Sequence, residues 1–100
     1  MMQNHENQIS NLLYTYTHRF DAGDFEGAAA LFRHASINTR GRDAPIDYLE
    51  LLETWRSMVI VYEDTGTPKT KHMCTNAIIN VDEDALHASA ESYYMVLQQT

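Results

Sequence analysis

The sequence predicts an α+β fold in which helices come first and an antiparallel hairpin comes last. Apolar residues recur at steps of three and four in three stretches of the first two thirds of the chain. The last third contains two runs rich in β-branched, aromatic and alternating residues, separated by the acidic turn Asp82–Ala85. This order is typical of helices packed on one face of a curved antiparallel sheet.

The first helix is expected from about Asn4 to Ala22. Its apolar stripe consists of Ile9, Leu12, Leu13, Tyr16 and Phe20. Gly23 supplies the left-handed residue that commonly ends a helix, and Asp24 can accept hydrogen bonds from the free amides of a second helix that begins at Phe25. The sequence therefore predicts a sharp turn between two helices at this point.

The second helix is expected to end by Arg33 or His34. Its apolar positions are Phe25, Ala28, Ala29 and Phe32. The partly β-branched segment 35–39 predicts a short edge strand, and the segment 40–43 predicts a turn.

A third helix is expected after Pro45, because proline suits the first turn of a helix. Its apolar stripe consists of Leu49, Leu52, Trp55, Val59 and Tyr62. The segment 63–68 has the composition of a loop and leads into the hairpin.

The hairpin is expected to pair the run from Thr70 to Val81 with the run from Leu86 to Leu97. A sheet of three strands would be small, and its open edge has to be paired or covered, either by a partner chain or by strands missing from this chain. We expect a homodimer or higher oligomer through the sheet, because its large apolar side chains are too many to leave in water on both faces. These side chains are Met73, Tyr93, Tyr94, Met95 and Leu97. Which face points inward stays open, since a shift of one residue in register exchanges the two sets.

Length and composition exclude several classes of protein. One hundred residues, 44% of them hydrophobic, predict a single folded domain over residues 1–100. The net charge of -7 disfavours nucleic acid as a partner. The N-terminal segment 1–7 lacks the pattern of a signal segment, and no apolar run is long enough to span a bilayer, so we expect a soluble, cytoplasmic protein without a membrane partner.

No metal or cofactor is expected. The histidines lack metal-ligand spacing, and Cys74 is the only cysteine, so a structural zinc site cannot form. The sequence contains no glycine-rich nucleotide motif. Cys74 could act as a nucleophile only beside a base such as His72, and the alternative is an inert thiol.

Two short motifs carry a family resemblance. Asp21 closes the first helix ahead of Gly23-Asp24-Phe25, and the pair Lys71-His72 opens a long strand with Asn76 four residues after the histidine. These motifs resemble the nuclear transport factor 2-like superfamily, in particular its SnoaL-like branch, which also contains scytalone dehydratase, bile acid dehydratase and hexachlorocyclohexane dehydrochlorinase. The resemblance implies a cone-shaped, cystatin-like curved sheet against three N-terminal helices. It also implies that this chain is short by two C-terminal strands.

The resemblance further implies that Asp21 and His72 form a dyad at the mouth of a pocket. A neutral imidazole is a competent base near pH 7, and a neighbouring carboxylate fixes its tautomer and stabilises the imidazolium. The alternative is that Asp21 only supports the turn and that His72 is a core histidine.

Two tyrosines are candidates for polarising a substrate carbonyl. Tyr16 matches a tyrosine of the bile acid dehydratase branch, whereas Tyr14 shares a helical face with Asp21. Each could equally be a core or rim residue. The candidate pocket-lining residues are Trp55, Met58, Val59, Tyr62, Cys74 and Asn76. Aromatic residues and methionines at helical spacing can also be plain core.

We therefore expect a cofactor-free lyase or isomerase of the dehydratase or cyclase type, acting on a small apolar carbonyl or polyketide-like substrate. The alternative is a non-catalytic small subunit or ligand-binding module, similar to the small subunits of ring-hydroxylating dioxygenases. A third possibility is a plain dimer-forming protein with a filled cone. Phe20 stands where scytalone dehydratase has a tyrosine, and no second histidine occurs at 93–96, so that enzyme's substrate is disfavoured.

Overall fold

The computed structural model describes residues 4–99. Its elements are α1 (His5–Asp21), α2 (Phe25–Ala30), α3 (Tyr48–Met58), β1 (Thr70–Val81) and β2 (Ala88–Gln98). The fold is α+β, with the predicted order of helices followed by a long antiparallel hairpin. Residues 1–3 of the N-terminal segment 1–7, which lacks a signal pattern, lie outside the described residues.

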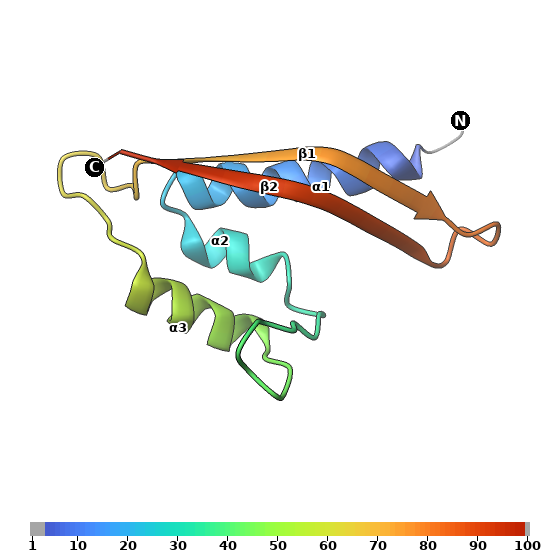
Figure 1. Cartoon of the computed structure of the whole chain (residues 1–100), viewed down its shortest axis with the longest axis horizontal. Helices are drawn as coiled ribbons and strands as arrows, with labels where there is room; N and C mark the ends of the chain where they lie inside the picture. Colours follow the sequence, from blue (N-terminus) through green and yellow to red (C-terminus); the bar gives the residue numbers. More distant parts are fainter. Residues whose placement is uncertain (1–3, 100) are drawn as a thin grey trace.

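α1 lies alongside the hairpin, and α2 and α3 follow on one side at increasing distance from it (Figure 1). α1 runs along the hairpin and contacts β1, α2 packs against both α1 and α3, and α3 is set away from the strands. Because α3 is held through α2, a space remains between the helices and the inner face of the sheet, and this space forms the pocket described below.

The junction between α1 and α2 has the predicted turn geometry. Gly23 adopts a left-handed φ of 84°, and the side chain of Asp24 accepts a hydrogen bond of 2.9 Å from the backbone N–H of Gly27. α2 ends at Ala30, several residues earlier than predicted, and the chain continues in turns closed by bonds between residues three apart. These turns carry Phe32 over the side of α1.

The predicted edge strand at 35–39 is wrong. Only Ile37 pairs there, through two backbone hydrogen bonds with Ile46 of 2.9 and 2.8 Å. The pairing ends there because α3 begins directly after Ile46, with Asp47 as its N-cap, and because on the other side the Arg42 N–H turns back to the Thr39 carbonyl. Among the described residues the sheet therefore has two strands, β1 and β2.

α3 differs from its prediction at both ends. Asp47 is the N-cap and accepts a hydrogen bond of 2.9 Å from the backbone N–H of Glu50, so Pro45 precedes the helix instead of lying in its first turn. Leu51 is the buried leucine, whereas Leu49 is more than half exposed. Tyr62 lies beyond the helix, in an isolated bridge with Thr67.

The register of the hairpin decides which face of the sheet points inward. Three cross-strand pairs line the pocket: Thr70 with Gln98, His72 with Val96, and Cys74 with Tyr94. The residues between them, such as Met73 and Met95, lie on the outer face. The sequence alone did not decide which face of the sheet points inward. In this part of the hairpin the inward face consists of the even-numbered residues.

A β-bulge exchanges the two faces of β1 farther along. The register shifts between Thr75 and Ile78, and Asn76 in the bulge has a positive φ of 54°. Beyond the bulge Ile79 and Val81 are the partly buried residues, while Ile78 is exposed. The bulge thus lets apolar residues face α1 at both ends of a twelve-residue strand.

The core lies at the point where α1, α2 and α3 meet. Phe20 and Phe25 pack edge to face with ring centroids 4.9 Å apart, and Ala28 is fully buried beside them. Trp55 stands perpendicular to Phe20 at 5.1 Å. This aromatic cluster sits directly beneath His72, whose ring is 4.8 Å from that of Phe20, so the core supports the site.

Candidate active site

Asp21 is the last residue of α1 and connects the helix to the start of β1. Its Oδ1 accepts a hydrogen bond of 2.7 Å from the Thr70 hydroxyl and lies 2.7 Å from Nδ1 of His72. Its Oδ2 accepts a bond of 2.8 Å from the backbone N–H of His72. Both carboxylate oxygens therefore accept hydrogen bonds, and they hold His72 through its backbone N–H and through its ring.

The Asp21 carboxylate is ionised at neutral pH. Partial burial alone would raise the pKa of Asp21, but the hydrogen bonds from the His72 backbone, the His72 ring and the Thr70 hydroxyl outweigh it. The pKa of Asp21 is thus lowered below its ordinary value. A carboxylate in this state can only accept hydrogen bonds.

This charge state sets the tautomer of His72. Since Asp21 cannot donate, the 2.7 Å contact requires a proton on Nδ1 of His72. In the neutral imidazole, Nε2 then carries the lone pair. The His72 side chain is only 9% exposed, and its ring lies in the wall of this mainly apolar pocket.

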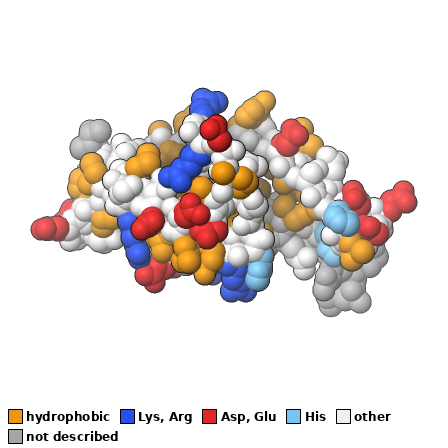
Figure 2. Space-filling view, turned by 90° about the horizontal axis from the view of Figure 1, so that it is seen from below, with side chains coloured by type: hydrophobic (Ala, Val, Ile, Leu, Met, Phe, Trp, Pro, Cys, Tyr) orange, Lys and Arg blue, Asp and Glu red, His pale blue; other side chains and the backbone are white. Residues whose placement is uncertain are grey.

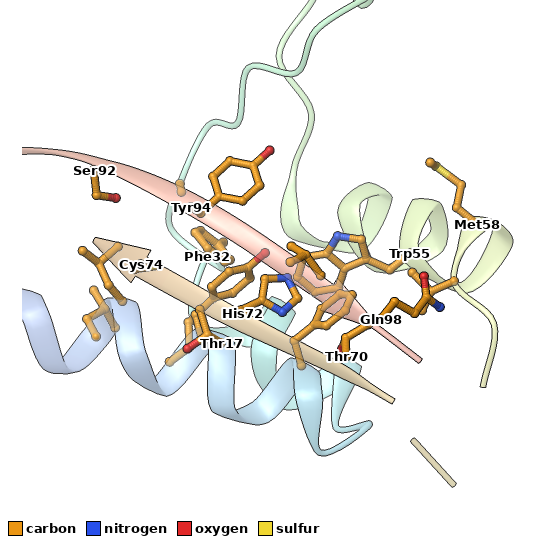
Figure 3. Close-up of a pocket in the computed structure, with 18 of the residues that line it drawn as sticks. Thr17, Phe32, Trp55, Met58, Thr70, His72, Cys74, Ser92, Tyr94 and Gln98 are labelled. Carbon is orange, nitrogen blue, oxygen red and sulfur yellow. The ribbon is translucent and has the colours of Figure 1, made fainter. Parts of the chain in front are cut away.

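The pocket has a volume of about 960 Å³ and is lined mainly by apolar side chains from α1, α3, β1, β2 and the turns after α2. Figure 3 shows His72 between the two ends of the pocket, with Ser92 toward one end and Met58 toward the other. Polar groups enter the wall at only a few positions, among them Tyr16, Thr17 and Thr70. An apolar pocket with few convergent polar groups is typical of a site for a small ligand.

Tyr16 lies in the wall beside His72, and their rings are 6.2 Å apart in an edge-to-face arrangement. Burial, followed by the influence of Cys74, Tyr94 and Asp21, raises the pKa of Tyr16 above its ordinary value. The hydroxyl therefore stays protonated at neutral pH and can donate a hydrogen bond. Tyr14 does not line the pocket and is 45% exposed, so Tyr16 is the one of the two candidate tyrosines that lies beside His72.

Four of the six candidate lining residues do line the pocket: Trp55, Met58, Val59 and Cys74. The other two do not. Tyr62 follows the end of α3, where its hydroxyl donates to the backbone oxygen of Gln99 at 3.3 Å and its ring lies under the Lys69 ammonium group. Asn76 sits in the β-bulge, which breaks the alternation that would have continued the inward face from His72 and Cys74.

Sequence reasoning missed several residues of the site. Thr70 holds Asp21, and alternation back from His72 could have found it once the inward face was known. Ser92, Tyr94 and Gln98 line the pocket from β2, and their discovery required the register of the hairpin. Thr17 is buried on α1, and its hydroxyl donates to the backbone oxygen of Tyr14.

The described residues contain a group of possible metal ligands away from the pocket. Asp82, Asp84 and His87 lie within 4.8 Å of one another in the hairpin turn, and all three are exposed. Exposed acidic groups of this kind are common without an ion.

On the face shown in Figure 2, acidic and basic side chains are interspersed among hydrophobic ones. In the described part of the chain, every helix is too short or too polar to cross a membrane.

The fold and the site together define an α+β domain of the nuclear transport factor 2-like class, with a carboxylate–imidazole pair in the wall of an apolar pocket. Residues 3–100 match the SnoaL-like domain, and the chain belongs to this family. This domain is common in isomerases, cyclases and dehydratases. No curated protein and no solved structure matches the chain significantly.

Proposed function

We propose that the protein is a cofactor-free lyase or isomerase that removes a proton next to the carbonyl group of a small, largely apolar substrate. The observation that carries this proposal is the hydrogen-bonded pair of Asp21 and His72, which leaves Nε2 as the basic nitrogen in the wall of an apolar pocket. A cytoplasmic location stays a prediction.

In the first step, Nε2 of His72 takes the proton from the carbon next to the carbonyl. The electron pair of the C–H bond moves to the carbonyl oxygen, which becomes an enolate and accepts a hydrogen bond from the Tyr16 hydroxyl. Asp21 stabilises the positive charge that forms on the imidazole.

The second step differs between the two reaction types. In a lyase, the enolate electrons expel a leaving group from the neighbouring carbon, and the imidazolium returns its proton to that group. In an isomerase, the imidazolium returns its proton to a different carbon of the same substrate. Both routes restore neutral His72, so a single base accounts for the whole cycle.

The apolar wall favours this chemistry in two ways. It selects substrates with a large apolar surface, and it strengthens the electrostatic interactions among Asp21, His72 and the developing charges because water is displaced. Trp55 and Phe32 contribute aromatic surface on the helix side of the pocket.

The proposal can be tested without knowledge of the natural substrate. Exchange of the protons next to the carbonyl for deuterium is followed by proton NMR in D₂O, using a panel of small cyclic ketones and aryl ketones. The protein is expected to accelerate exchange for at least one ketone that fits the pocket. His72→Gln is expected to reduce this acceleration by roughly 10²–10⁴-fold, the usual contribution of a general base.

His18→Gln is the matched control, because His18 is exposed on α1 and does not line the pocket. This variant is expected to exchange at the wild-type rate. Equal exchange by wild type and the His72→Gln variant would refute the proposed role of His72. A ketone that binds in the pocket without any exchange would instead indicate a ligand-binding module.

A further inference from the structure

The Thr70 hydroxyl is, among the described residues, the one donor to Asp21 that does not belong to His72. Asp21 accepts two hydrogen bonds from His72, through the ring and the backbone N–H, and one of 2.7 Å from Thr70 Oγ1. In the described part of the chain, Asp21 forms no ion pair with a lysine or an arginine. The carboxylate that orients the imidazole is therefore itself oriented by a single residue outside the pair.

Thr70 and the His72 ring share one oxygen of the carboxylate. Oδ1 of Asp21 lies 2.7 Å from both Thr70 Oγ1 and His72 Nδ1, whereas Oδ2 accepts from the His72 backbone. The torsion that turns a carboxylate group has a broad minimum, so the two bonds to His72 restrict its rotation only weakly. The third bond, which comes from another residue, keeps Oδ1 directed at the ring nitrogen.

Thr70 is firmly placed at the start of β1. Its side chain is branched at Cβ, which restricts its rotamers, and the residue is only 9% exposed. It pairs with Gln98 in the hairpin and shares the inward face with His72. The hydroxyl has one proton, and it donates this proton to Asp21. Its donor is thus committed to the carboxylate and is not free for a ligand.

The backbone just before Thr70 is strained. Lys69 has a positive φ of 55°, which residues other than glycine rarely adopt. The Lys69 ammonium group donates to Asp64 at 2.8 Å and lies 4.9 Å from the centre of the Tyr62 ring, and the preceding Pro68 is fully buried. These contacts hold the corner at which the chain enters β1. Strain that is held in this way is concentrated at functional sites.

We propose that Thr70 is a positioning residue, whose hydroxyl holds the Asp21 carboxylate so that neutral His72 keeps its proton on Nδ1 and its lone pair on Nε2. This role rests on the proposed function for its effect on catalysis, whereas the hydrogen bonds do not. Thr70 acts through Asp21 and does not touch the reacting atoms. Without the hydroxyl, the carboxylate turns, and Nδ1 loses its acceptor in part of the molecules.

Hydrogen bonds rather than a further charge decide the state of the pair. The titratable side chains that line the pocket with His72 are Tyr16 from α1, Cys74 from β1 and Tyr94 from β2. Among the described residues, α3 and the turns after α2 add no titratable group to the lining, and no lysine, arginine, aspartate or glutamate lines it. Removal of the Thr70 hydroxyl therefore changes no charge around the ring.

The first test is nitrogen-15 NMR of the His72 ring, without ligand and at a pH at which the ring is neutral. Thr70→Val has nearly the shape of threonine and suits a strand, and a population with the proton on Nε2 is expected to appear. Thr70→Ala, a second variant without the hydroxyl, is expected to do the same. Thr70→Ser keeps the hydroxyl and the wild-type spectrum. Thr17→Val is the matched control, because the buried Thr17 hydroxyl donates to the backbone oxygen of Tyr14.

The second test is a pH titration of the Asp21 carboxyl group, followed by carbon-13 NMR. Partial burial raises the pKa of Asp21, and the hydrogen bonds from the His72 backbone, the His72 ring and Thr70 lower it below its ordinary value. Thr70→Val is therefore expected to raise the pKa of Asp21 relative to wild type. Thr70→Ser and Thr17→Val are expected to leave it unchanged.

The third test joins this role to catalysis through the exchange of ketone protons. Thr70→Val is expected to lower kcat by roughly 10-fold, the low end of the range for groups that orient a functional histidine. KM is expected to stay nearly unchanged, because valine keeps the shape of the pocket wall. Thr70→Ser is expected to retain most of the rate. Circular dichroism shows that each variant is folded.

A Thr70→Val variant that keeps the His72 proton entirely on Nδ1, or that leaves the pKa of Asp21 unchanged, overturns the proposal, because Asp21 would then be held without Thr70. A Thr70→Ser variant that behaves like Thr70→Val overturns it too, because the hydroxyl would then not be the group that matters. If the wild type exchanges no ketone, the proposed function fails, and the two NMR tests still decide the role of Thr70.

Discussion

Asp21 occupies a position that an isolated helix disfavours. A carboxylate at the C-terminal end of α1 faces the negative end of the helix dipole. Three hydrogen bonds from β1 compensate for this, two from His72 and one from Thr70. An acidic residue in an unfavourable local position, stabilised by partners far along the chain, is expected at a functional site rather than in a purely structural turn.

These hydrogen bonds to Asp21 make the free energy of unfolding depend on pH. The pKa of Asp21 is lowered in the folded state, so its contribution is present above its ordinary pKa of 3.8 and is lost as pH falls through the lower folded value. Asp21→Asn is expected to destabilise the fold at pH 7 by about 1.5–3 kcal/mol, the usual worth of a hydrogen bond to a charged group. Urea unfolding followed by circular dichroism measures this difference.

The difference between wild type and the Asp21→Asn variant is expected to narrow as pH falls below the ordinary pKa of 3.8, because wild-type Asp21 then becomes protonated. Asp24→Asn serves as a control, since Asp24 is exposed and caps α2 without contacting β1. A difference that is constant with pH would show that the lowered pKa of Asp21 does not contribute to stability.

At the scale of the elements, the turn after α1 holds the site in register with β1. Gly23 has a positive φ of 84°, and a Cβ at this position would lie 2.5 Å from the backbone oxygen of Gly66. Gly66 belongs to the loop that leads to Thr70, so this close approach brings the end of α1 and the start of β1 together. Only glycine fits without moving one backbone against the other.

Gly23→Ala is therefore expected to destabilise the protein more than Gly41→Ala. Gly41 also has a positive φ, of 89°, but a Cβ there would meet no atom within 4 Å. Both variants bear the cost of a left-handed alanine, about 1 kcal/mol or more, and only Gly23→Ala adds the clash with Gly66. Equal midpoints of thermal unfolding for the two variants would contradict this account.

At the scale of the whole molecule, periodicity and turn chemistry predicted the helices, the hairpin and the α+β class. The helix stripes identified Phe20 and Trp55, and the glycine and aspartate after α1 identified the turn. The edge strand at 35–39 failed because the helix that begins after Ile46 and the turn between Thr39 and Arg42 limit pairing to one bridge. Local patterns therefore predicted the elements, whereas contacts between segments decided how far each element extends.

In the candidate site, too, local patterns predicted some features, whereas contacts between segments decided the others. The two short motifs singled out Asp21 and His72, and the structure brings these residues into hydrogen-bond contact. Thr70 and Tyr94 could not be assigned from sequence, because the inward face depends on the register of the hairpin. Regular alternation along β1 would place Asn76 on the same face as His72 and Cys74, but the bulge interrupts that alternation in the folded strand.

The proposed function depends on the state in which the folded chain presents His72 to its pocket. Nitrogen-15 NMR of the His72 ring at neutral pH, without and with an apolar ketone, tests it most directly. We expect the neutral ring to carry its proton on Nδ1 and a lone pair on Nε2, and we expect the Nε2 resonance to shift when the ketone binds. A proton on Nε2 in the neutral ring, or an Nε2 resonance unchanged at a ketone concentration that saturates the pocket, would contradict the account.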